Sequence, residues 1–141
     1  MTIELPLPVI KVVGISASGK STLVQELRNR GYDVRPVSQE HSNVASLWRY
    51  FEKPQWLIFL DVSLEVQRVR RPDVSWSIDW HWTEQLRLQQ ARDHADIVID
   101  TSEMTPAGVA ALAILFLERN RVRHVSEPLP PLAATGGVRK G

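Results

Sequence analysis

The stretch Gly14-Ile15-Ser16-Ala17-Ser18-Gly19-Lys20-Ser21 matches the pattern GxxxxGK[ST] at every fixed position. This pattern is typical of a loop that binds phosphate groups when a strand leads into it and a helix leaves it. Residues 9–13 form a mostly apolar run that predicts a buried strand, and residues 22–28 have the spacing of an amphipathic helix. The motif therefore stands in the strand, loop and helix order that it requires.

The residue types of this loop suit a polyphosphate. Glycines let the backbone come close to the ligand, consecutive backbone N–H groups surround a phosphate, and the following helix directs its positive N-terminus toward it. Lys20 adds a full positive charge at the β- and γ-phosphates, and Ser21 offers a hydroxyl to the Mg²⁺ ion that bridges them. We therefore expect a nucleotide with Mg²⁺ to bind at Gly14, Ser16, Ala17, Ser18, Gly19, Lys20, Ser21 and Thr22, of which Thr22 serves mainly as a helix residue.

The composition fits one α/β domain, because 141 residues with 43% hydrophobic content can form a single core. The formal net charge of +1 leaves no basic excess for binding nucleic acid in bulk. The absence of cysteine excludes disulfides, thiolate metal sites and cysteine nucleophiles. The N-terminus lacks signal-peptide features and the longest apolar run, residues 107–117, is too short to cross a bilayer, so we expect a cytoplasmic protein without a membrane partner.

Further along the chain, strands and helices alternate. Strands are predicted at residues 32–37, 55–61 and 95–100, and Pro36 marks the first of these as an edge strand. Helices are predicted at residues 44–51, 64–71, 79–94 and 105–118. Ser63 precedes the second helix as a cap, and Thr105-Pro106 opens the last one. The alternation predicts a three-layer α/β/α fold with a mostly parallel sheet of four to five strands.

The sequence predicts a boundary after residue 118. Residues 1–118 form the expected nucleotide-binding domain, whereas residues 119–141 turn basic and then proline-rich and are expected to be a C-terminal tail. A loosely packed terminus and a proline-rich ligand for a partner are the two interpretations of this tail. We assign it no function.

Three segments resemble the P-loop kinase family, the group that holds nucleoside, nucleotide, shikimate, gluconate and adenylylsulfate kinases. They are the loop at residues 14–21, the strand and arginine-bearing helix at residues 57–71, and the last strand and helix, which begin at residues 95 and 105. Together they cover most of residues 8–118. The resemblance implies a P-loop NTPase fold and the use of ATP with Mg²⁺.

The resemblance also assigns three arginines to the nucleotide. By its spacing from Glu65, Arg70 matches the arginine that stacks on the adenine in this family, and Arg68 and Arg71 are candidates for phosphate contact. Guanidinium groups suit this role because they pair bidentately with the oxygens over which a transferring phosphoryl group spreads its charge. The alternative is a solvated helix face.

Glu40 follows the second predicted strand, where deoxynucleoside-kinase-like members of the family carry an acid that acts as base toward the acceptor hydroxyl. Such an acid need only accept the proton late, because positioning supplies most of the catalysis. Glu40 is therefore a candidate for base or for orienting Mg²⁺, against the alternative of an ordinary loop carboxylate, and His41 could share the task. Lys20, Glu40 and Arg70 are the catalytic candidates.

Asp61 ends an apolar strand, as an acid that orients Mg²⁺ would, so Ser21 and Asp61 are the candidate metal residues. In the resembling kinases, however, the matching segment lies on another strand and its aspartate has a more structural part. Two roles therefore stay open for Asp61, one in the shell of the metal ion and one in the turn after the strand. The chain also departs from the family at residues 38–54, which are too few for both a usual acceptor-binding region and a further strand.

Tryptophans at positions 76, 80 and 82 crowd between the arginines and the following helix. They could stack on a base or close over the site, or they could form a small satellite core under a loop. The same alternatives apply to Trp48.

Two functions from different classes follow. The first is a small kinase that transfers the γ-phosphoryl group of ATP to the hydroxyl of a small metabolite or nucleoside. The second is a nucleotide-binding regulatory or sensor module without efficient phosphotransfer, which the short acceptor region favours. The missing Asn-Lys-x-Asp and Asp-x-x-Gly signatures argue against GTP and a GTPase. We expect no nucleic-acid partner, and the sequence does not predict an oligomeric state.

Overall fold

A parallel sheet forms the middle layer of the molecule. The computed structural model describes residues 6–132, and within them the sheet has four strands in the order β2-β1-β3-β4. The strands are β1 (Ile10–Gly14), β2 (Val34–Pro36), β3 (Trp56–Asp61) and β4 (Ile97–Asp100), and each neighbouring pair is parallel. The prediction of a mostly parallel sheet is confirmed. Of the four to five strands expected, the described residues form four.

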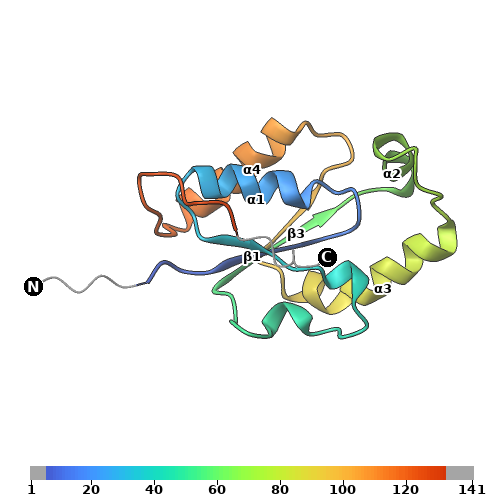
Figure 1. Ribbon diagram of the computed structural model, residues 1–141, viewed down its shortest axis with the longest axis horizontal. Coiled ribbons are helices and arrows are strands. Elements are labelled where there is room, and N and C mark those ends of the chain that lie inside the picture. Colours follow the sequence, from blue (N-terminus) through green and yellow to red (C-terminus); the bar gives the residue numbers. More distant parts are fainter. Residues whose placement is uncertain (1–5, 133–141) are drawn as a thin grey trace, which may run out of the picture.

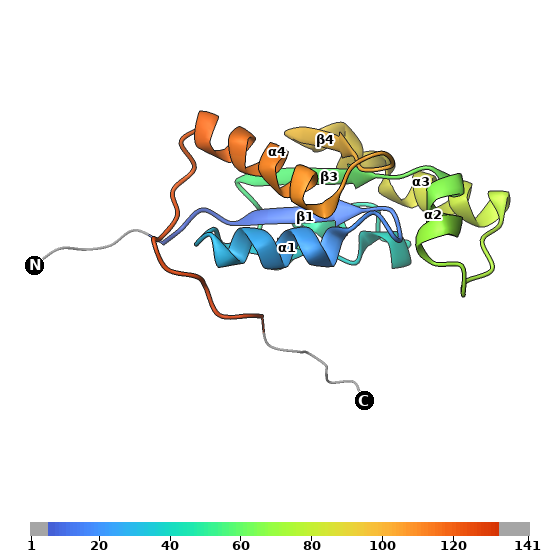
Figure 2. The same ribbon diagram turned by 90° about the horizontal axis from the view of Figure 1, so that it is seen from above.

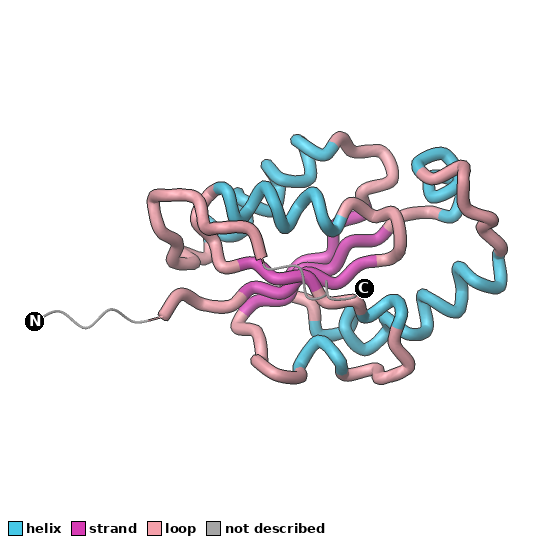
Figure 3. Tube along the Cα trace, viewed as in Figure 1, coloured by secondary structure: helices cyan, strands magenta, loops and turns pink. Residues whose placement is uncertain are grey.

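Helices cover both faces of this sheet, as Figures 1 and 3 show. On one face lie α1 (Lys20–Asn29) and α4 (Pro106–Arg119). On the other face lie α3 (Ile78–His94) and two short 3₁₀ turns, η1 (Gln39–His41) and η2 (Leu47–Arg49). The short helix α2 (Leu64–Arg70) stands beyond the carboxyl end of β3 (Figure 1). The three-layer α/β/α fold expected from the sequence is therefore present.

Each central strand serves two hydrophobic cores, because successive side chains of a strand point to opposite faces. In β3, Ile58 and Leu60 pack into the core beneath α1 and α4, whereas Leu57 and Phe59 pack into the core beneath α3. All four side chains are buried. This explains why the β3 sequence is continuously apolar rather than alternating.

Side-chain caps fix where three helices begin. The hydroxyls of Ser63, Ser77 and Thr105 each accept a hydrogen bond from the backbone N–H three residues later. Pro106 occupies the first turn of α4, where its missing N–H costs no helical hydrogen bond. Two of these caps follow the sequence prediction, and the Ser77 cap moves the start of α3 to Ile78.

The segment between β2 and β3 differs from the prediction. Instead of one helix at residues 44–51, it forms the two single turns η1 and η2. Lys11, a buried residue of β1, holds this segment because its Nζ donates to the carbonyl oxygens of Trp48 (3.1 Å) and Tyr50 (3.0 Å). Burial lowers the pKa of Lys11. The loop carbonyls thus supply the partners that a buried ammonium needs, and these tertiary bonds replace a regular helix.

The segment after α4, residues 120–132, lies against α1 and passes its C-terminal end (Figure 2). Leu129 N–H donates to the carbonyl of Arg28 (2.9 Å), and the Arg28 guanidinium donates back to the carbonyl of Pro130. Gly31 adopts a φ of +89°, and a Cβ there would lie 1.9 Å from the carbonyl oxygen of Val125. The first part of the predicted tail is therefore in close contact with the domain, and its remainder, residues 133–141, lies outside the described residues.

No helix within residues 6–132 has both the length and the apolar character needed to span a bilayer.

Candidate functional site

The glycine-rich loop, residues 14–21, joins the carboxyl end of β1 to the first turn of α1. Ala17 and Gly19 both have left-handed backbone conformations, with φ of 66° and 97°. Alternation of such residues with ordinary ones turns backbone N–H groups toward a common point, which makes a concavity for an anion. A left-handed alanine is unusual outside sites where the surrounding structure imposes it.

Two further features of the loop suit an anion. Gly19 precedes α1, and no side chain caps the N–H groups of that helix's first turn. The hydroxyl of Ser18 is buried without a hydrogen-bond partner among the described residues. Buried hydroxyls and exposed helix N-termini normally find an acceptor, so the loop fits the phosphate group of a nucleotide.

Lys20 and Glu40 are in direct contact. The Nζ of Lys20 lies 2.6 Å from both carboxylate oxygens of Glu40 and 3.1 Å from the carbonyl oxygen of Val37. The side chains are 13% and 7% exposed. Two residues that the sequence suggests for opposite sides of a reaction, the nucleotide and the acceptor, thus form one ion pair.

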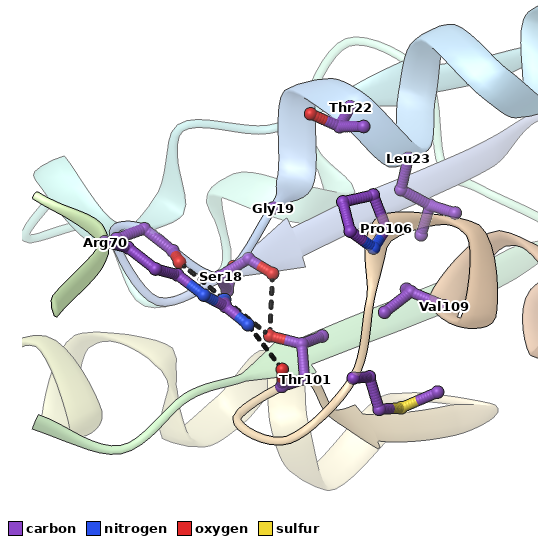
Figure 4. Close-up of a pocket in the computed structure, with 10 residues that line it drawn as sticks. Ser18, Gly19, Thr22, Leu23, Arg70, Thr101, Pro106 and Val109 are labelled. Carbon is purple, nitrogen blue, oxygen red and sulfur yellow. Dashed lines mark hydrogen bonds between the residues drawn. The ribbon is translucent and has the colours of Figure 1, made fainter. Parts of the chain in front are cut away.

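The first cavity lies on the α4 side of the loop and has a volume of about 310 Å³. Figure 4 shows its lining, which comes from the loop, α1, α2 and the segment after β4. Thr22 and Leu23 of α1 contribute to one wall, and Pro106 and Val109 of α4 form an apolar patch. An apolar slot beside an anion-binding loop has the chemistry that a nucleotide base and its phosphates require together.

Arg70 of α2 lines this cavity and reaches two other segments (Figure 4). Its guanidinium donates to the carbonyl oxygen of Ala17 (2.9 Å) and to the side-chain oxygen (3.0 Å) and carbonyl of Thr101. Thr101 in turn donates to the carbonyl of Ser18 (2.8 Å). Asp100 precedes Thr101 in the chain, and the hydrogen bonds that it accepts from Ser102 lower its pKa.

The other two candidate arginines have different contacts. Arg68 donates to the carbonyl of Trp76 (3.3 Å) at an exposed position. Arg71 pairs with Asp73 at 2.8 Å and 3.0 Å, which raises the pKa of Arg71 and lowers that of Asp73. Arg70 therefore donates hydrogen bonds to the glycine-rich loop directly, whereas those of Arg68 and Arg71 go to Trp76 and Asp73.

A second cavity, of about 360 Å³, lies on the other side of Ala17. Glu40 and His41 form one side, and Trp76 and Trp80 provide aromatic surface. The imidazole of His41 lies 3.9 Å from the Glu40 carboxylate. The residues that line this cavity are Ser16, Ala17, Glu40, His41, Arg71, Val74, Trp76 and Trp80.

Three of the four tryptophans fit one of the two interpretations open from the sequence, and the exposed Trp82 fits neither. Trp76 and Trp80 line the second cavity, and the Arg87 guanidinium lies 5.2 Å from the centre of the Trp80 ring. Trp82 is 60% exposed and Trp48 is buried in the core beneath α3.

Comparison with solved structures finds a thymidylate kinase from Candida albicans. The two structures superpose with a TM-score of 0.61 at 12% sequence identity, over 87% of this chain and 96% of that one. The chain has the P-loop kinase-like fold. The identity is too low to show more than the fold, and no protein-family model and no curated protein matches the chain. The P-loop kinase resemblance seen in the sequence is confirmed at this level.

Within this P-loop kinase-like fold, Asp61 has contacts of a structural residue. One carboxylate oxygen accepts hydrogen bonds from the N–H of Val62 (2.8 Å) and from Gln85 (3.3 Å), and the other pairs with Arg92 (2.7 Å). Both oxygens are thus engaged in tying β3 to α3. Residues 6–132 contain no group of three or more His, Asp or Glu side chains arranged to hold a metal. These contacts favour a structural role for Asp61 in the turn after β3 over a role as a metal ligand. Ser21, which is exposed at the start of α1, stays the better-placed candidate for Mg²⁺.

A buried polar network behind the loop was not expected from the sequence. Glu84 of α3 is fully buried and accepts a hydrogen bond from the Ser16 hydroxyl. Gln67 of α2, also fully buried, donates to the Ser16 carbonyl (2.8 Å) and contacts the His81 ring at 2.7 Å. The network connects the loop of the P-loop kinase-like fold to both α2 and α3. Glu84 stands three residues before Arg87, the spacing of an ordinary surface ion pair, so no sequence signal marks it as buried.

Proposed function

We propose that this chain is a small ATP-dependent kinase that transfers the γ-phosphoryl group to a small molecule. The observation that carries the proposal is that two cavities meet at Ala17 of the glycine-rich loop, one on each side. A phosphoryl transfer needs donor and acceptor to approach a shared point from opposite directions, because the attacking and leaving oxygens lie roughly in line. The kinase-like fold is consistent with this arrangement.

On the donor side, the first cavity would take the adenine and the loop would take the phosphates. The unpartnered Ser18 hydroxyl and the uncapped N-terminus of α1 support this assignment. Lys20 would contact the β- and γ-phosphates, and Ser21 would hold Mg²⁺ together with phosphate oxygens. Bound Mg²⁺ would neutralise charge that develops on those oxygens. Arg70 would lie over the base, since its side chain lines the cavity.

On the acceptor side, the second cavity would take a molecule with a planar ring. Trp76 and Trp80 offer aromatic surface for stacking, and Glu40 offers a carboxylate for the acceptor hydroxyl. The similar structure is a thymidylate kinase by name, which agrees with a nucleoside or nucleotide as acceptor. We therefore place nucleosides and nucleotides first among the acceptors to be tested.

The test is ATP consumption with Mg²⁺, measured for the protein alone and with pools of nucleosides, nucleotides, sugars and small hydroxy acids. We expect ADP formation to rise with a nucleoside or nucleotide pool and to disappear in Lys20→Ala, because that substitution removes the charge meant for the transferring group. Wild-type ATP binding without stimulation by any pool would instead favour the regulatory or sensor module, which the short segment between β2 and β3 also suggests. Activity that survives Lys20→Ala would contradict both functions.

A further inference from the structure

The ammonium group of Lys20 has no donor left for a ligand in this structure. Its three hydrogen bonds within the described chain go to the two carboxylate oxygens of Glu40 and to the carbonyl of Val37. An ammonium has three N–H bonds, so this set matches its full capacity. The residue that the motif assigns to the phosphates is thus already bound to an anion of the chain itself.

The Glu40 carboxylate depends on this contact in turn. His41 is the next basic group, 3.9 Å away, and its side chain is 64% exposed. Arg87 donates to the main-chain carbonyl of Glu40 (3.2 Å) rather than to its carboxylate. Arg71, which lines the same cavity, is paired with Asp73. Lys20 is therefore the close charge partner of a carboxylate that is 7% exposed.

We infer that the Glu40 carboxylate pairs with the Lys20 ammonium in the absence of nucleotide, and that the phosphates of a bound nucleotide displace this carboxylate. Phosphate oxygens and the carboxylate cannot both take the three N–H bonds of one ammonium, and their negative charges repel each other. An exchange of one anion for another keeps the partly buried lysine neutralised throughout, which avoids leaving an unpaired charge. Glu40 is a competitor of the nucleotide as well as a residue of the acceptor cavity.

The exchange implies an order of binding, in which the nucleotide binds before the acceptor. Glu40 already lines the second cavity, so the carboxylate released from Lys20 is placed at the acceptor's wall without a large movement. While Lys20 donates to both carboxylate oxygens, they are engaged in that contact, whereas a released carboxylate can accept the hydrogen bond of an acceptor hydroxyl. Nucleotide binding would thereby prepare the acceptor side. This second step rests on the proposed function, whereas the competition at Lys20 requires nucleotide binding alone.

The experiment is a titration of Glu40→Gln with ATP and Mg²⁺, and with inorganic triphosphate, followed by calorimetry. Glutamine keeps the length of the side chain and removes the charge that competes with phosphate. We expect the Kd for ATP and for triphosphate to fall by about tenfold, because losing a direct competitor for an ion pair is an effect of that order. Glu26→Gln is the matched control, since it removes a carboxylate from an exposed position on α1, and its Kd should equal that of the wild type.

Thermal unfolding provides a second readout that does not depend on turnover. Glu40→Gln should unfold at a lower temperature than the wild type without ligand, because Lys20 loses its partner, and should gain more stability from ATP. An unchanged or higher Kd in folded Glu40→Gln would overturn the competition and leave the proposed kinase standing. If Glu40→Gln does not fold, Glu40→Asp replaces it, because its shorter carboxylate should reach Lys20 less well. We then expect the Kd for ATP to fall by less than tenfold, and an unchanged Kd in Glu40→Asp would also overturn the competition. Absence of ATP binding to the wild type would instead contradict the proposed function and the exchange together.

Discussion

A single guanidinium, that of Arg70, joins the glycine-rich loop to the segment after β4. Its two contacts reach Ala17 in the loop and Thr101 beyond the sheet. Arg68, two residues earlier on α2, contacts an exposed carbonyl instead. Residues two apart on a helix point in different directions, so the two arginines cannot serve the same site. The planar fork of an arginine can hold both partners at once, whereas an ammonium is a point charge on a flexible stem.

We predict that Arg70→Lys weakens ATP binding by about tenfold, because lysine keeps the charge but loses the fork that spans Ala17 and Thr101. Arg68→Lys is the control, and its Kd should stay within about twofold of the wild type. Equilibrium binding of a fluorescent ATP analogue measures both. Equal losses in the two variants would mean that overall positive charge, rather than the position of Arg70, determines binding.

The same residues show which part of the site a sequence can predict. The glycine-rich loop is a local feature whose spacing along the chain sets its geometry, so its position between β1 and α1 is confirmed. The contact between Ser16 and Glu84 depends on how α3 packs under the sheet, across 68 positions of sequence. Nothing in the neighbourhood of Glu84 records that packing. Spacing singled out Arg70 for the base but also assigned Arg68 and Arg71 to the phosphates, and only the direction of α2 shows that these two have other partners.

At the level of elements, the segment after α4 depends on backbone contacts. Val125 and Leu129 donate their N–H groups to the carbonyls of Gly31 and Arg28, and Val122 is buried in the core beneath α1 and α4. Backbone hydrogen bonds leave no trace in residue type, and prolines in a basic stretch favour an open tail. The sequence therefore predicts a tail where residues 120–132 instead close over the end of α1.

We predict that Gly31→Ala lowers the free energy of unfolding by about 2–4 kcal/mol, because it combines a left-handed φ with a direct clash. The new Cβ would lie 1.9 Å from the carbonyl oxygen of Val125, so the segment after α4 would have to move away. Urea unfolding measures the loss. Gly108→Ala in α4 is the control, and its effect should be below about 1 kcal/mol. A small effect of Gly31→Ala would mean that this segment adds little to the stability of the domain.

At the level of the whole molecule, the sheet makes the two cores interdependent. β1 and β3 lie at its centre, and each sends alternate side chains into the core beneath α1 and α4 and the core beneath α3. The alternation of strands and helices along the chain was sufficient to predict this layered arrangement. The number of strands was less certain, because residues 38–54 carry no strand pattern and the structure folds them into two short turns.

We predict that the two cores unfold together, since neither can lose its strands without exposing the other. Leu27→Ala in α1 and Leu88→Ala in α3 remove fully buried side chains from opposite faces of the sheet. Each should lower the free energy of unfolding by about 2–5 kcal/mol and shift one common transition. Far-UV circular dichroism follows the helices. Tryptophan fluorescence follows Trp48 in the core beneath α3 when the other four tryptophans, at positions 56, 76, 80 and 82, are replaced by phenylalanine in the wild type and in both variants. The two signals should give coincident urea curves in both variants, and a fluorescence change that precedes the helical signal in Leu88→Ala would show that the core beneath α3 unfolds by itself.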